Sequence, residues 1–213
     1  MFISFEGIDG SGKTTQINHM VKFLQDNRHS CVITREPGGT RIGEKIRAIL
    51  LDPISKDMDP LTELLLYTAD RAQHIKEFVS PFLSAGKTVL CDRFYDATVV
   101  YQGFARGIDV GLIDKLHKLL FGNLKPDITI LLDLPPEKGL SRAWKQIKNG
   151  DRENVETRFE KEELSFHNKV RSGYLELARL EPGRFRVIDA SMDENQVRNE
   201  LIKILSDEMK PNI

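Results

Sequence analysis

The sequence has few cysteines, no long apolar run and almost no net charge. Its two cysteines, Cys31 and Cys91, lack Cys-x-x-Cys spacing, so we expect both to be reduced residues of the core. No apolar run approaches the roughly 18 residues needed to span a bilayer, and the start, MFISFEGIDG, has neither the basic nor the long apolar region of a secretory signal. These absences exclude a membrane function and favour a cytoplasmic protein.

The charges nearly cancel, with 31 Lys and Arg against 32 Asp and Glu and a net charge of -1. The chain therefore lacks the overall positive field that holds a polyanion such as DNA, and we expect no nucleic-acid partner. Any anion site must be local. The histidines are scattered without the spacing of metal ligands, so we expect them to be structural or exposed: His19, His29, His74, His117 and His167.

Short apolar runs alternate with longer helical patterns along the 213 residues, and no repeat, low-complexity tract or linker divides them. With 40% hydrophobic residues, the chain has enough apolar content for one domain, residues 1–213. The alternation predicts an α/β fold in which helices cover a five-stranded parallel sheet. The predicted strands are 1–6, 31–34, 88–92, 128–133 and 186–189. The predicted helices are 13–27, 40–51, 60–84 with a break near Pro81, 97–106, 110–119, 136–148, 157–180 and 194–209.

One segment, residues 145–161, differs in composition from the rest of the chain. Its sequence, KQIKNGDRENVETRFEK, contains almost no apolar residues and lies between two predicted helices. Composition alone favours a solvated surface loop over a functional flap.

A glycine-rich segment, GIDGSGKT at residues 7–14, has the spacing G-x-x-x-x-G-K-T between a predicted strand and a predicted helix. Its glycines let the backbone turn N–H groups inward, and the start of the following helix adds partial positive charge. The Lys13 ammonium can then reach terminal phosphates, and the Thr14 hydroxyl can bind Mg²⁺. A plain glycine-rich turn seldom has this pattern at this place, so we predict a nucleotide phosphate site.

Two acidic residues accompany this loop. Asp9 would be repelled by a phosphate among the loop amides, so we expect it to face a second ligand such as a sugar hydroxyl. Asp92 ends a predicted strand, where a carboxylate can orient Mg²⁺ through water, although a helix N-cap explains it equally well. The adjacent Arg93 has the planar fork that suits a phosphate.

Other segments indicate what accepts the phosphoryl group. The N-K-x-D motif of guanine-specific switches is absent. Residues 35–40, 67–71, 92–94 and 101–103 follow predicted strands or lie on the third helix, and in a doubly wound sheet they lie beside the phosphate loop. Their aromatic rings, amide and arginines are suited to a base and a phosphate.

These segments closely resemble the bacterial thymidylate kinases, P-loop enzymes that phosphorylate dTMP to dTDP. The resemblance runs in the expected order through FEGIDGSGKTTQ, TREPGGT, YTADRAQH, DRFYDATVVYQG, PDITILLDLPPEKGLSRA, VRSGYLELA and VIDA. TREPGGT together with DRFYDATVVYQG is far more specific than the phosphate loop alone. The family implies a P-loop three-layer α/β/α sandwich, ATP as donor, Mg²⁺, a homodimer and a role in dTTP biosynthesis.

The resemblance also implies roles at the thymine base. Tyr67 resembles the ring that stacks on thymine, although its place in the apolar stripe 64–67 also fits a core aromatic. The leucines at 64–66 lie on a helix that fits the core, a dimer face or both. Arg71 and Gln102 resemble the polar groups around the base, with Thr98 nearby.

At the sugar and phosphate of dTMP, Arg93 resembles the arginine that holds the phosphate. The resemblance implies that Arg47 and the turn of Glu36 and Pro37 lie close to it. Tyr101 resembles the aromatic group that crowds the sugar 2′ position, and Asp9 resembles the carboxylate that faces the sugar.

In nucleotide kinases a lid closes over the donor phosphates, and the resemblance implies such a lid at residues 142–160. The phosphate loop has no arginine, so the chain resembles the subtype whose lid supplies the catalytic arginine. This lid starts with fewer arginines than many bacterial relatives. Arg152 is the expected catalytic residue, with Arg142 and Arg158 as alternatives. The expected ATP-binding residues are Gly7, Ile8, Asp9, Gly10, Ser11, Gly12, Lys13, Thr14, Thr15 and Arg142.

The implied reaction moves the γ-phosphoryl group of ATP to the phosphate of dTMP. The attacking oxygen is already anionic, so no general base is required. Lys13, Arg93 and Arg152 would neutralise the repulsion between two polyanions, with Thr14 and Asp92 at Mg²⁺.

Two other functions compete with this interpretation. A deoxynucleoside kinase would phosphorylate a sugar hydroxyl and would need a carboxylate base, for which Glu6 or Asp92 are candidates. An ATP-dependent switch or nucleic-acid motor is disfavoured by the neutral charge and the single domain.

Overall fold

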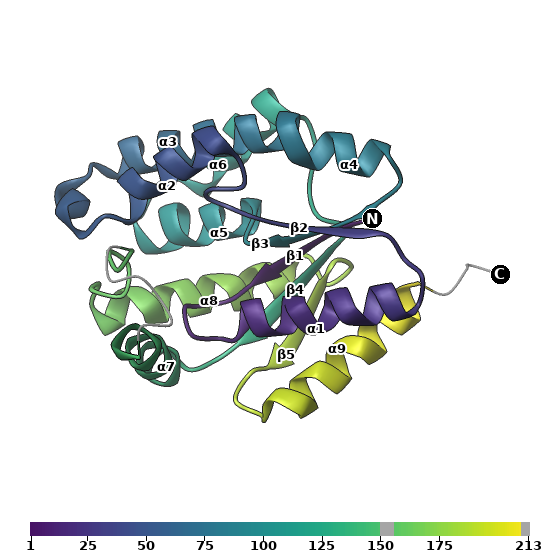
Figure 1. Cartoon of the computed structure of the whole chain (residues 1–213). Coiled ribbons are helices and arrows are strands. Elements are labelled where there is room, and N and C mark those ends of the chain that lie inside the picture. The colour runs from purple at the N-terminus through teal and green to yellow at the C-terminus, as the bar shows by residue number, and fades with distance from the viewer. Residues whose placement is uncertain (150–155, 210–213) are drawn as a thin grey trace.

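The computed structural model describes residues 1–149 and 156–209. A central sheet of five parallel strands has the order β2-β3-β1-β4-β5, which confirms the predicted fold class (Figure 1). The strands are β1 (Phe2–Glu6), β2 (Cys31–Arg35), β3 (Thr88–Asp92), β4 (Ile128–Asp133) and β5 (Phe185–Asp189).

The strand register brings three loops to one edge of the sheet. Phe5 of β1 and Arg35 of β2 both pair with Asp92 of β3, so these strands end at the same level. All five residues of β1 are buried, as expected for a strand covered on both faces. The glycine-rich loop, the turn after β2 and the segment after β3 therefore lie next to one another.

Helices cover both faces of the sheet (Figure 1). Helices α1 (Lys13–Asp26) and α9 (Glu194–Glu208) lie side by side on one face. Right-handed crossovers place the other helices on the opposite face, because the sheet order reverses after β2. They are α2 (Arg41–Leu51), α3 (Pro60–His74), α4 (Ser80–Ser84), α5 (Tyr95–Thr98), α6 (Val110–Phe121), α7 (Pro136–Lys148) and α8 (Leu164–Leu180).

Three helix predictions need correction. The helix predicted at 60–84 is not broken near Pro81, which lies in the first turn of α4, where a missing N–H is tolerated. A wider π-helical turn, Ile75–Val79, joins α3 to α4. The helix predicted at 97–106 begins earlier, with α5 at Tyr95, and continues as a second π-helical segment, Val99–Ala105. The helix predicted at 157–180 begins only at Leu164. The structure also adds a short 3₁₀ helix, Pro53–Asp57, that was not predicted.

The solvated loop that composition favours at 145–161 is wrong near its carboxyl end, at residues 157–160. Helix α7 continues to Lys148, and the side chains of Thr157, Arg158, Phe159 and Glu160 are buried. Arg158 can be buried here because its guanidinium pairs with the Glu63 carboxylate within the fold. Residues 150–155 lie outside the described part of the chain.

The cysteine prediction is confirmed for Cys91, which is a buried free thiol on β3. Cys31 is also free but is only half-buried at the margin of the core. Within residues 1–149 and 156–209, no helix has both the length and the apolar character needed to cross a membrane.

Candidate active site

A cavity of about 500 Å³ lies at the carboxyl ends of β1, β2 and β3. The structure brings most of the predicted site residues together around it. Those lining the cavity are Asp9, Gly10, Gly12, Lys13, Thr14, Thr15, Glu36, Pro37, Arg47, Tyr67, Arg71, Asp92, Arg93, Thr98, Tyr101 and Gln102. Gly7, Ile8 and Ser11 are buried in the loop itself and do not line the cavity.

The phosphate loop wraps around the Lys13 ammonium. Lys13 Nζ donates to the carbonyl oxygens of Gly7 at 3.3 Å and Ile8 at 3.1 Å. Helix α1 begins at Lys13, and Gly12 precedes it with a φ of 94° and no side-chain cap. The first N–H groups of the helix therefore remain available to an anion. Burial, aided by nearby Arg93, lowers the pKa of Lys13.

Thr14 and Asp92 are placed where a phosphate-bound cation would need them. Thr14 is exposed at the start of α1, Asp92 ends β3, and both line the cavity. No cluster of three or more His, Cys, Asp or Glu side chains that could hold a metal occurs among the described residues. This donor set fits Mg²⁺, which is usually held by one or two protein oxygens together with phosphates and water.

Arg93 lies between the phosphate loop and the rest of the cavity. Its Nη2 donates to Asp9 Oδ1 at 3.0 Å, its Nη1 donates to the Tyr174 hydroxyl at 3.2 Å, and its guanidinium lies 5.1 Å from the Tyr101 ring centre. The backbone of Arg93 has a φ of 68°, which is uncommon for a residue with a side chain. Its N–H nevertheless donates to Phe5 O at 3.0 Å.

The cavity wall also holds polar groups that are fixed by hydrogen bonds to neighbouring side chains. Arg71 Nε donates to Glu36 Oε2 at 2.9 Å, and its Nη2 donates to Thr98 Oγ1 at 2.8 Å. The other carboxylate oxygen of Glu36 forms a hydrogen bond with His74 Nδ1 at 2.8 Å. Glu36 is therefore fixed from two sides and holds the Arg71 side chain in place. Gln102 donates from Nε2 to a carboxylate oxygen of Glu63 at 2.8 Å.

The remaining residues that were predicted to bind dTMP also line the cavity. Tyr67 is half-buried and packs on the core as well as lining the cavity, so it combines the two interpretations that the sequence allowed. The buried Tyr101 hydroxyl has no partner among the described residues. Arg47 forms a two-pronged ion pair with Glu156, at 2.8 and 2.7 Å, and donates to Pro37 O at 3.0 Å.

Of the proposed lid arginines, only Arg142 and Arg158 belong to the described residues, and they do not lie together. Arg152 lies outside the described residues. Arg142 is exposed, donates to Ala190 O at 3.1 Å and does not line the cavity. Arg158 is buried in an ion pair with Glu63 and donates to Leu50 O at 3.0 Å. Arg158 is therefore a poor candidate for the catalytic arginine.

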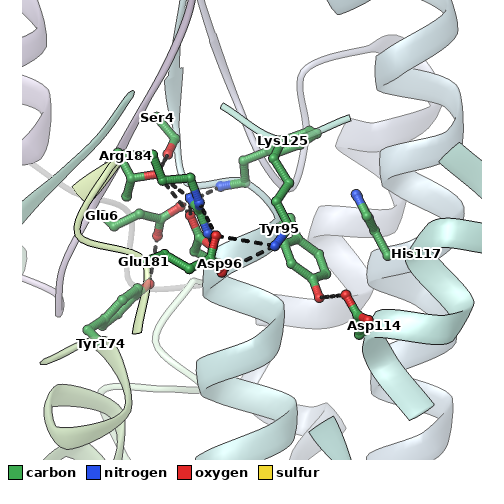
Figure 2. Close-up of polar contacts among 12 residues, drawn as sticks. Ser4, Glu6, Tyr95, Asp96, Asp114, His117, Lys125, Tyr174, Glu181 and Arg184 are labelled. Atoms are coloured by element: carbon green, nitrogen blue, oxygen red, sulfur yellow. Dashed lines mark hydrogen bonds and ion pairs between the residues drawn. The ribbon is translucent and has the colours of Figure 1, made fainter. Parts of the chain in front are cut away.

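Glu6, a candidate base for a sugar kinase, is excluded by its surroundings. It is the last residue of β1, is fully buried and does not line the cavity. It accepts from Phe94 N at 2.8 Å and from the Tyr174 hydroxyl at 2.7 Å, the second of which is drawn in Figure 2. Burial, with the nearby Asp96 carboxylate, raises the pKa of Glu6 from 4.5 to about 8. Asp96 is itself held by both Nη atoms of Arg184, each at 2.6 Å.

The sequence interpretation missed several residues of the site. Gln146, Glu156, Phe159 and Glu160 also line the cavity. Phe159 is the one phenylalanine in an otherwise polar stretch, and an isolated aromatic of this kind is a usable signal for burial. No sequence pattern indicated Glu63 or Tyr174, because each contacts a site residue that is distant in the sequence: Glu63 contacts Gln102, and Tyr174 contacts Arg93.

Comparisons with known proteins agree on one family. The family model described as thymidylate kinase matches residues 5–201. The thymidylate kinases of Desulfosudis oleivorans and Desulforapulum autotrophicum are each 56% identical to this chain, covering 96% and 95% of it and 96% and 89% of their own lengths. The crystal structure of thymidylate kinase from Ehrlichia chaffeensis superposes with a TM-score of 0.75 at 36% identity, covering 96% of this chain and 98% of that one.

Proposed function

This chain belongs to the thymidylate kinase family, and we propose that the cavity described above is where it transfers the γ-phosphoryl group of ATP to dTMP. The products of this reaction are dTDP and ADP, and dTDP serves dTTP synthesis. The observation that carries the proposal is the position of Arg93. It contacts Asp9 of the phosphate loop and also the ring of Tyr101, and both of these residues line the cavity.

The two nucleotides would meet at Arg93 with their phosphates facing each other. Lys13 and the loop amides would hold the donor phosphates, and Arg93, with Arg47 and Pro37 nearby, would hold the phosphate of dTMP. The attacking oxygen belongs to an anionic phosphate, so no base is needed. The inaccessibility of Glu6 is consistent with this chemistry.

A Mg²⁺ ion held at this site would supply positive charge that offsets part of the charge of the donor phosphates. Thr14 would bind it directly and Asp92 would orient it through water. The fold would position Thr14 and Asp92 for this role, because the start of α1 and the end of β3 lie at one edge of the sheet.

At the base, Tyr67 would stack on thymine while Arg71, Thr98 and Gln102 face its polar edge. All four line the cavity, and Arg71 Nη2 donates to Thr98 Oγ1 at 2.8 Å. Tyr101, only 6% exposed, would crowd the sugar 2′ position, and Asp9 would face the sugar.

We assign the lid to residues 142–160 and the catalytic arginine to Arg152. The burial of Phe159 and Glu160 against the cavity supports a segment that ends in the active site. Arg142 stays a predicted ATP-binding residue, on the resemblance alone, because it does not line the cavity. Lid closure would exclude water, which would otherwise accept the phosphoryl group.

A homodimer is supported by an apolar surface on α2, α3 and α6. These helices pack side by side, and Leu119 on α6 is 81% exposed. Exposed apolar side chains concentrated on neighbouring helices typically mark an interface. The exposed members are Ile42, Ile49, Leu61, Leu65, Leu112, Leu119 and Leu120. Sedimentation equilibrium should give twice the chain mass of 24.3 kDa, and a monomer at all concentrations would reject the dimer. A cytoplasmic location and the lack of a nucleic-acid partner remain predictions.

An acceptor panel tests the proposed reaction. The purified protein would be supplied with ATP, Mg²⁺ and, one at a time, dTMP, dUMP, other nucleoside monophosphates and thymidine, and ADP formation would be followed. We expect turnover with dTMP and none with thymidine. Turnover with thymidine alone would replace the proposal with a deoxynucleoside kinase, and DNA-stimulated ATP hydrolysis would replace it with a motor.

A further inference from the structure

The orientation of the Gln102 side-chain amide follows from its neighbour Glu63. Gln102 Nε2 donates to Glu63 Oε1 at 2.8 Å. A carboxylate only accepts hydrogen bonds, so the NH₂ group must be the end that faces it. The carbonyl Oε1 of Gln102 is left without a partner among the described residues, and Gln102 lines the cavity. The amide therefore offers an acceptor to a ligand.

Glu63 is held in place by a cluster of cations. It lies in the first turn of α3 and is completely buried. Arg158 pairs with its Oε2, and Arg106 donates to both of its oxygens at 3.4 Å. The Arg106 guanidinium lies 4.6 Å from the Phe166 ring centre, which limits its movement. With donors on both oxygens, the carboxylate presents a fixed acceptor to Gln102.

We propose that Glu63 is a positioning residue that sets base specificity, because it holds the carbonyl of Gln102 toward the base and selects a pyrimidine with an N3–H donor. The inference rests on the proposed function, in which the base lies at Gln102 and Arg71. Thymine and uracil offer an N3–H donor and an O4 acceptor. Cytosine reverses both groups, with an unprotonated N3 and a 4-amino donor.

Arg71 strengthens the discrimination. Its Nε and Nη2 are used by Glu36 and Thr98, while its Nη1 has no partner among the described residues and the side chain lines the cavity. An acceptor from Gln102 beside a donor from Arg71 matches the N3–H and O4 groups of thymine. With cytosine, the carbonyl of Gln102 would face the unprotonated N3 and Nη1 of Arg71 would face the 4-amino group. Each mismatch leaves a desolvated polar group unpaired.

Replacing Glu63 by glutamine has a directional consequence. Either the carbonyl oxygen or the NH₂ group of the new amide can face Arg158. The carbonyl oxygen is favoured at that position because a guanidinium only donates hydrogen bonds. Its NH₂ group then faces Gln102, whose amide turns to accept that hydrogen bond. The NH₂ group of Gln102 would now point toward the base and oppose the N3–H of thymine.

The test compares dTMP with 5-methyl-dCMP, which share the methyl group, sugar and phosphate and differ at N3 and C4. In Glu63→Gln, the ratio of kcat/KM for dTMP to that for 5-methyl-dCMP should fall at least about tenfold, mainly through a higher KM for dTMP. The KM for ATP should stay unchanged. Glu63→Asp keeps an acceptor-only group and should retain most of the preference. An unchanged ratio in Glu63→Gln would overturn the proposal.

Glu162→Gln is the matched control. Glu162 Oε1 accepts from Arg106 Nη2 at 2.6 Å, so it shares the cation cluster without bonding to Gln102. Its ratio should match that of the unaltered protein. An equal fall in this variant would assign the effect to the charge of the cluster and overturn the role of Glu63.

A double-mutant cycle tests whether Glu63 acts through Gln102. Gln102→Leu should itself lower the ratio, and adding Glu63→Gln should lower it no further. A further independent fall would overturn the positioning role. If Glu63→Gln does not fold, an unchanged ratio in Gln102→Leu alone would overturn it.

Titration calorimetry separates this inference from the proposed reaction. Binding of dTMP and of 5-methyl-dCMP would be measured without ATP. If the unaltered protein prefers dTMP in binding but makes no dTDP, the proposed reaction fails while the base preference is retained. If it makes dTDP and the preference survives Glu63→Gln, only the inference fails.

Discussion

Removing the hydroxyl of Tyr174 should weaken the hold on dTMP while leaving ATP binding intact. Arg93 has two side-chain anchors, Asp9 at 3.0 Å and the Tyr174 hydroxyl at 3.2 Å. Tyr174 comes from α8 and donates in turn to Glu6 at 2.7 Å, so its oxygen faces Arg93 as an acceptor. Tyr174→Phe keeps the ring and deletes only this link.

The magnitude follows from the two bonds that are lost. The contact with Arg93 is long, and a hydrogen bond of this kind is worth about 0.5–1.5 kcal/mol, so the KM for dTMP should rise about 2- to 10-fold. Glu6 Oε2 loses its donor in a fully buried place, which should lower the free energy of unfolding by about 1–3 kcal/mol.

A coupled ADP assay and urea unfolding measure the two effects separately. We expect a higher KM for dTMP, a KM for ATP within about twofold of the unaltered protein and a modest loss of stability. Lower stability with an unchanged KM for dTMP would refute the anchoring of Arg93 by Tyr174. An equal rise in both KM values would also refute it.

Further substitutions test the phosphate site and the buried carboxylate. Lys13→Ala and Arg93→Ala should each lower kcat by about 100-fold or more while circular dichroism shows a folded chain; near-normal turnover in either variant would remove that residue from the mechanism. Gly10→Ala places a methyl group 2.1 Å from a carbonyl oxygen of α7 and should lower stability by more than the control Gly86→Ala, which has a similar positive φ but open space; equal losses would contradict the clash. The pKa of Glu6 rises from 4.5 to about 8 on folding, so between these pH values the native state holds a proton that the unfolded state has lost. The free energy of unfolding should therefore decrease as the pH rises from 4.5 to about 8, by at most about 1.4 kcal/mol per pH unit. Glu6→Gln should flatten this decrease in urea titrations, and parallel pH profiles would disprove it.

The parts of the site that were predictable from the sequence lie at the ends of elements. Lys13 begins a helix and Asp92 ends a strand, so their places follow from local patterns once the sheet is parallel. The sheet itself was predictable because buried parallel strands are short apolar runs.

The parts that were not predictable depend on distant partners. Glu63 contacts Gln102 across 39 residues, and Tyr174 contacts Glu6 across 168. Residues 157–160 have the composition of a surface loop, yet they are buried because Arg158 pairs with Glu63 and Phe159 packs against Tyr101. Composition reports the charges of a segment but not whether they are neutralised elsewhere in the fold.

The most direct test of the central claim follows the transferred group itself. The protein would be incubated with Mg²⁺, dTMP and ATP labelled at the γ-phosphoryl group, and the products would be separated. The account predicts that the label appears in dTDP, and that Arg93→Ala greatly slows its appearance. Label found only in inorganic phosphate, with dTMP unchanged, would contradict a cavity in which the two nucleotides meet at their phosphates.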